Sequence, residues 1–147
     1  MGYSMRYISV DEHEISLAVL ENIFKQSDAA YSFVDIQPQP RESATLTYHH
    51  EPYGAIEINK PGDGLFEDEL HDLKEFLEDI DGMGKKAVVQ VLANAKAIVA
   101  VQVLFQGRKP EETLGRIDPL WQWLFDNREG LLQVDGEGYY DGTQLIL

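Results

Sequence analysis

The chain has 147 residues, and its 26 acidic side chains outnumber the 12 lysines and arginines, which gives a formal net charge of −14. Affinity for nucleic acids comes mostly from neutralising phosphates, so this charge argues against a nucleic-acid partner and, for the same reason, against anionic membranes. The absence of cysteine excludes disulfides, a thiol nucleophile and cysteine-bound metal or iron–sulfur sites. The length predicts one acidic domain over residues 1–147.

No secretory or membrane-spanning segment is visible in the sequence. The first ten residues lack an apolar core of the signal-peptide type, and Gln90, Asn94, Lys96 and Gln102 interrupt the one long apolar stretch. We therefore expect a cytoplasmic protein with no membrane partner.

The first sixty residues alternate between strand and helix patterns. Residues 5–8 fit a short strand, and Ser9 with Glu12 has the spacing of a capping box that opens a helix running to about residue 26. Three strands follow at Tyr31–Gln37, 44–49 and 55–59, separated by proline-rich and glycine-rich turns. A meander is the simplest pairing for these strands.

Residues 65–81 form the strongest predicted helix. Its apolar residues recur every three or four positions and define one stripe: Phe66, Leu70, Leu73, Leu77 and Ile80. Its other face carries eight acids against the single Lys74: Glu67, Asp68, Glu69, Asp72, Glu75, Glu78, Asp79 and Asp81. We predict that this face is a solvated acidic surface.

The stretch 86–106 is the most apolar of the chain, and its β-branched residues favour strands. We interpret it as the central hairpin of the sheet, with a turn at residues 94–96. One face of the second strand, with Val99, Val101 and Val103, belongs to the core. The opposite face is too apolar for open water, and a partner subunit, a helix or a ligand could cover it.

A third helix is predicted over residues 110–128, where Pro119 should kink or split it. Short strands at 131–134, 138–140 and 144–147 are separated by Asp-Gly dipeptides, which are typical of tight hairpin turns. The fold class predicted from these elements is α+β: an antiparallel or mixed sheet with a central hairpin at about 86–106 and three helical segments packed on it.

Few candidate sites resemble known chemistry. The glycine-rich segments 62–67 and 82–87 lack the spacing of nucleotide-binding loops, and neither a Gly-x-Ser-x-Gly nor a His-Glu-x-x-His motif occurs. Glu67, His71 and Glu75 are spaced by four residues on one helix face and could hold a metal, although a solvated acidic face needs no ligand. We expect no catalytic residues, no cofactor and no metal, and leave enzymatic activity open with a preference against it.

Several aromatic residues lie outside the predicted core stripes. Trp123 lies off the stripe of its helix, and Tyr139 and Tyr140 must point to opposite faces of their strand. Exposed Tyr and Trp beside acids are typical of protein interfaces, whereas a second layer of the same core is the simpler explanation.

The leading hypothesis is a non-catalytic protein-interaction module that shields or inhibits a basic partner, as a small acidic inhibitor of a toxin would. The residues predicted to bind that partner are Glu67, Asp68, Asp72, Glu75, Trp123, Tyr139, Tyr140 and Asp141. Two alternatives remain: a small metal-dependent enzyme or binding protein that uses His71, Glu67 and Glu75, and a self-associating domain that forms a homodimer.

Overall fold

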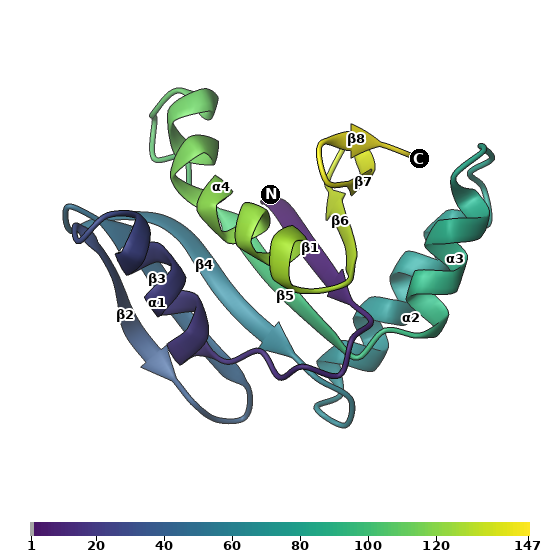
Figure 1. Ribbon diagram of the computed structural model, residues 1–147, viewed down its shortest axis with the longest axis horizontal. Helices are drawn as coiled ribbons and strands as arrows, with labels where there is room; N and C mark the ends of the chain where they lie inside the picture. The colour runs from purple at the N-terminus through teal and green to yellow at the C-terminus, as the bar shows by residue number, and fades with distance from the viewer. Residues whose placement is uncertain (1) are drawn as a thin grey trace.

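A computed structural model describes residues 2–147 as an α+β fold, with four helices and a single antiparallel sheet of eight strands in that range (Figure 1). The strands are β1 (Tyr3–Ser9), β2 (Tyr31–Gln37), β3 (Glu42–Tyr48), β4 (Glu51–Asn59), β5 (Ala97–Val103), β6 (Gly130–Val134), β7 (Gly138–Asp141) and β8 (Gln144–Leu145). The helices are α1 (Leu17–Ser27), α2 (Leu65–Leu77), α3 (Lys85–Ala93) and α4 (Pro110–Asn127). The strand order is β2-β3-β4-β5-β1-β6-β7-β8.

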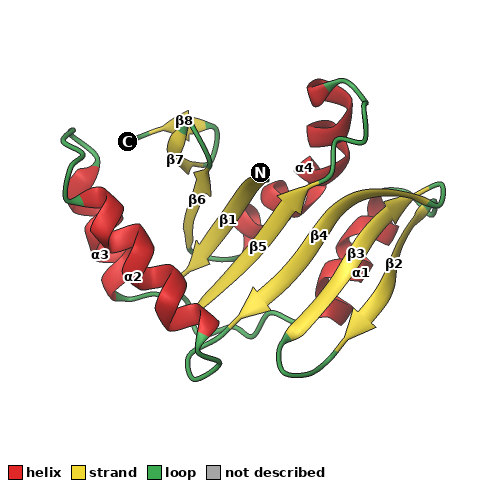
Figure 2. Cartoon of the chain, turned by 180° about the vertical axis from the view of Figure 1, so that it is seen from behind, coloured by secondary structure: helices red, strands yellow, loops and turns green. Residues whose placement is uncertain are grey.

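Each face of the sheet carries a pair of helices. On the first face, α1 and α4 pack on the aromatic and aliphatic side chains of β1 to β6 and enclose the larger core cluster. On the second face, α2 and α3 cover a smaller cluster around Ile8, Ile98, Leu131 and Tyr139. Figure 2 shows that this second pair crosses one end of the sheet and leaves the faces of β2, β3 and β4 uncovered.

The predicted central hairpin is wrong in its first half. Lys85–Ala93 is the helix α3, and the strand β5 pairs with β4 and β1, which are distant from it in sequence. Val88 and Leu92, four residues apart, are buried on one side of α3, while Val89 on the other side is 48% exposed. Helical spacing against the sheet therefore overrides the strand preference of β-branched residues in this segment. Residues 2–147 consequently contain four helices rather than three.

The second strand of that hairpin was predicted correctly. Val99, Val101 and Val103 are buried in the larger core, and Ile98 is buried on the opposite face beneath α3. Of the covers considered for this opposite face, a helix is the one found. The covering side chains, Val88 and Leu92, belong to the segment that was expected to be the neighbouring strand.

The first helix begins later than the capping-box pattern predicts. Ser9 is the last residue of β1, and the helix starts at Leu17, where the Ser16 hydroxyl accepts a hydrogen bond from the Val19 N–H at 3.3 Å. Pro119 lies inside an uninterrupted α4, so the helix is not split there. The terminal Asp-Gly turns are confirmed, because Gly136 and Gly142 adopt positive φ angles of 77° and 63°.

Candidate functional site

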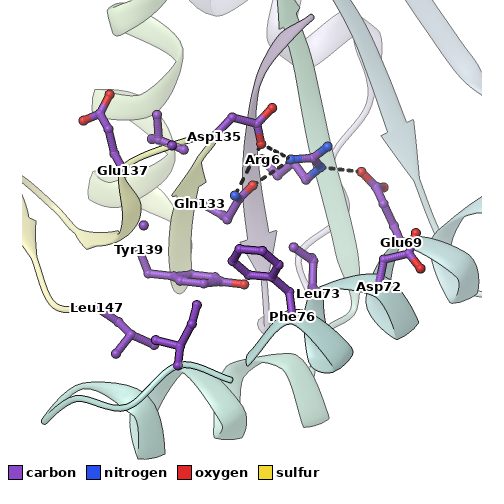
Figure 3. A pocket seen from close by; sticks show the side chains of 14 residues that line it. Arg6, Glu69, Asp72, Leu73, Phe76, Gln133, Asp135, Glu137, Tyr139 and Leu147 are labelled. Carbon is purple, nitrogen blue, oxygen red and sulfur yellow. Dashed lines mark hydrogen bonds and ion pairs between the residues drawn. The ribbon is translucent and has the colours of Figure 1, made fainter. Parts of the chain in front are cut away.

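A hollow of about 510 Å³ lies on the second face of the sheet, between α2 and the strands β1, β6 and β7 (Figure 3). Charged and amide side chains line one end: Arg6, Glu69, Asp72, Gln133 and Asp135. Apolar and aromatic side chains line the other end: Leu73, Phe76, Ile80, Val134, Tyr139 and Leu147. The hollow is therefore amphipathic along its length.

Arg6 organises the charged end of the hollow. Its Nε donates to Glu69 Oε2 at 2.8 Å, and its Nη1 donates to Gln133 Oε1 at 2.7 Å and to Asp135 Oδ1 at 3.0 Å. Glu69 also accepts a 2.9 Å hydrogen bond from the Nδ2 of the fully buried Asn59. Burial opposes the charge of Arg6, but the bonds to Glu69 and Asp135 outweigh it and raise the arginine pKa. This network ties α2 to β1, β4 and the end of β6.

Local sequence rules explain how these side chains meet. In β1, alternation directs Met5 and Tyr7 to the first face and Arg6 to the second. Arg6 lies directly opposite Gln133 in the pairing of β1 with β6. On α2, Glu69, Leu73, Phe76 and Ile80 follow at intervals of four, three and four, and Ile80 lies just beyond the end of the helix. Along this side of the segment, the charged Glu69 is thus followed by the apolar Leu73, Phe76 and Ile80.

Tyr139 forms part of the wall opposite α2. The residue is only 5% exposed, yet its hydroxyl makes no hydrogen bond within residues 2–147, and its ring points across the hollow toward Phe76 (Figure 3). Burial raises the pKa of Tyr139 to about 12, while Arg6 acts in the opposite direction. The phenol is therefore neutral at physiological pH and can both donate and accept a hydrogen bond.

The acidic face of α2 is exposed at the four positions predicted to bind a partner: Glu67, Asp68, Asp72 and Glu75. Glu69, which the sequence pattern also assigned to this face, turns inward to Arg6 instead. Glu67 has a structural task as well, since its carboxylate accepts hydrogen bonds from the N–H groups of Gly62 and Gly64 at 2.9 and 3.1 Å. Carboxylates thus occupy the backbone donors that a nucleotide-binding loop would need, which agrees with the interpretation of this segment as a turn.

The predicted aromatic members of the site do not gather in one place. Trp123 is half-buried against the larger core, and Arg128 lies 4.9 Å above its ring. Tyr140 packs on the first face and Tyr139 on the second, as their adjacency in the strand predicts, while Asp141 is exposed. Only Asp72 and Tyr139 of the predicted set line the hollow.

Sequence reasoning missed Arg6, Phe76, Gln133 and Asp135. Phe76 could have been found from the sequence, because it is an aromatic residue outside the apolar stripe of its helix; in the structure it is 71% exposed. Arg6 was a weaker candidate, as a cation within a largely apolar strand. Nothing local indicated that Gln133 and Asp135 would lie beside it.

The metal alternative loses one of its three ligands in this geometry. His71 Nε2 lies 3.2 Å from Glu75 Oε2, and both side chains are largely exposed. Glu67, however, is turned toward the loop at Gly62 and Gly64. Among residues 2–147, no cluster of three or more histidine, aspartate or glutamate side chains is arranged to hold a metal ion.

A second hollow, of about 500 Å³, lies on the first face between α4 and the strands β6 and β7. At its rim, Glu137 accepts hydrogen bonds from the hydroxyls of Tyr140 at 2.6 Å and Tyr3 at 2.7 Å. These bonds lower the pKa of Glu137, and partial desolvation raises that of Asp118 in the wall. Glu137 thus lines both hollows, and its carboxylate is engaged by the two tyrosine hydroxyls.

Comparison with known proteins returned no match: neither a family model, nor a curated protein, nor a solved structure resembles the chain closely enough to be assigned. Within residues 2–147, the helices are too short or too polar to cross a membrane.

Proposed function

We propose that this chain is a non-catalytic protein-interaction module that binds a basic partner protein through α2. One observation carries the proposal: the helix presents an exposed row of carboxylates directly beside the exposed ring of Phe76. Single exposed apolar side chains are common on protein surfaces, but an aromatic ring beside a row of charged side chains is a combination that interfaces often use as an anchor.

The charge of this surface is poorly compensated within the chain. Among residues 2–147, Asp68 and Asp72 have no cation within ion-pair distance, and Glu75 meets only the exposed His71. Charges of one sign on a helix repel one another, and a basic partner would relieve that repulsion. The same field would accelerate the encounter with such a partner, as in small acidic inhibitors that shield a toxin or nuclease.

The test begins with affinity capture from extracts of cells that express the protein, followed by stopped-flow association with each purified partner. Replacing Glu67, Asp68, Asp72 and Glu75 by their amides should slow association about tenfold at low salt, because steering depends on the local field. The difference should shrink as added salt shortens the screening length.

A matched control separates the α2 surface from the total charge. Glu12, Glu51, Glu111 and Glu112 are exposed acids away from α2, and their conversion to glutamine changes the net charge by the same amount. This control variant should associate nearly as fast as the wild type. Equal slowing of both variants, or partners that are consistently acidic, would refute the proposal.

A further inference from the structure

We infer that the hollow beneath α2 receives one lysine or arginine side chain of that basic partner. This inference rests on the proposed function and names the group that the site recognises. The hollow offers an apolar wall for a long aliphatic stem and carboxylates for a cationic head, which matches the two parts of either side chain.

The balance of charge in the hollow favours a cation. Arg6 is engaged by Glu69 and Asp135 through hydrogen bonds of 2.8 and 3.0 Å, so these three groups together keep one negative charge. Asp72 adds a second and has no cationic neighbour among residues 2–147. A glutamate or aspartate side chain from a partner would face this excess, whereas a lysine or arginine head would neutralise it.

Tyr139 adds a polar group to the wall of the hollow. Only 5% of the residue is exposed, and its hydroxyl, which bonds to no other group within residues 2–147, opens into the hollow, where water reaches it (Figure 3). A phenol oxygen can accept a hydrogen bond from an ammonium or guanidinium group. A purely apolar guest would leave this hydroxyl without a partner after water is displaced, which is costly.

Phe76 completes the arrangement. Its ring lines the hollow, and 71% of the residue is exposed. Aromatic faces attract lysine and arginine cations, and covering the ring also buries apolar surface. Phe76 and the phenol oxygen lie at one end of the hollow and Asp72 at the other, so a cationic head can meet either end while the aliphatic stem covers the apolar wall between them.

The experiment uses the full chain, labelled with ¹⁵N, and N-acetyl N-methylamide derivatives of single amino acids as probes. The lysine and arginine derivatives should shift the amide signals of Leu73, Phe76 and Tyr139 and saturate with a Kd on the order of 1–10 mM, as expected for fragments of this size. The norleucine derivative has nearly the same stem without the charge, and should bind at least about fivefold more weakly because it cannot pair with Asp72 or Tyr139.

Three variants locate the contacts. Asp72→Asn and Tyr139→Phe should each weaken lysine binding about three- to tenfold, the range expected for one hydrogen bond at a site that water can reach. Glu111→Gln removes the same charge as Asp72→Asn but lies on α4, and should leave the Kd within about twofold. Amide spectra of each variant verify that the fold is retained.

The outcomes separate this inference from the proposed function. Equal binding of the norleucine derivative, preference for the glutamate derivative, or no saturable shift would overturn the assignment of the hollow, even if charges on α2 still govern association with a partner. Saturable lysine binding combined with association that ignores those charges would instead refute the proposed function.

Discussion

The two faces of the sheet each carry two helices and a hollow of about 500 Å³, but the first face (the closed face) encloses the larger core and the second (the open face) leaves Phe76 exposed. On the first face, α1 and α4 enclose a core in which Leu20, Phe24 and Leu120 are 0% exposed. On the second, α2 and α3 cover a smaller cluster, and Phe76 remains largely exposed beside the hollow. The difference originates in the strands, whose second-face positions include Arg6 and Gln133 where the first face has apolar side chains. The larger share of the buried core therefore lies on the first face, while the charged network of Arg6 and the exposed ring of Phe76 lie on the second.

The largest effect should come from opening a cavity in the closed face. Leu120→Ala removes a fully buried side chain from α4 and should cost about 2–5 kcal/mol of unfolding free energy. Phe76→Ala on the open face should change it by less than about 0.5 kcal/mol, because its side chain is mostly in water. Urea denaturation of both variants measures the difference. Similar losses would show that the two faces contribute equally to stability.

A smaller effect should follow from breaking the network that ties α2 to the sheet. Arg6→Met leaves the half-buried carboxylates of Glu69 and Asp135 without their cation, which should cost about 1–3 kcal/mol, less than for a fully buried pair. Adding Glu69→Gln to this variant should restore part of the loss, since one unpaired charge is removed while an amide oxygen can still accept the hydrogen bond from Asn59. If Arg6→Met costs nothing, the network does not anchor the helix.

Most strands and three of the four helices of residues 2–147 were predicted, because strand alternation, helical spacing and Asp-Gly turns depend only on residues close together in the sequence. The segment Lys85–Ala93 was misassigned because it is short and rich in β-branched residues, so its apolar positions fit strand alternation almost as well as helical spacing. The segment forms a helix because Val88 and Leu92, four residues apart, pack together against the sheet. Asp72 could be placed in a surface site from composition alone. Arg6 and Gln133 could not, because their contact joins residues 127 positions apart in the chain.

Acid should weaken the cluster at the rim of the first face slightly. The hydrogen bonds from Tyr140 and Tyr3 lower the pKa of Glu137, so their stabilisation is complete above the ordinary glutamate pKa of about 4.3. It is lost as the pH falls through the lowered value. Because Glu137 is exposed, the contribution should be only about 0.5 kcal/mol. In Tyr140→Phe, carboxyl NMR titration should show the Glu137 pKa moving upward, and an unchanged pKa would contradict this account.

The smallest effect, close to zero, is expected from removing metal ions. The acids on the open face are interpreted as a solvated surface for a partner, and Glu67 already caps the turn before α2 instead of facing His71. A metal bound only by His71 and Glu75 would have two exposed protein ligands, too few for a structural site. Thermal melts with and without a chelator should therefore superimpose. A drop of several degrees on chelation would indicate a metal that stabilises the open face, and would make recognition of a basic partner the weaker explanation of its acids.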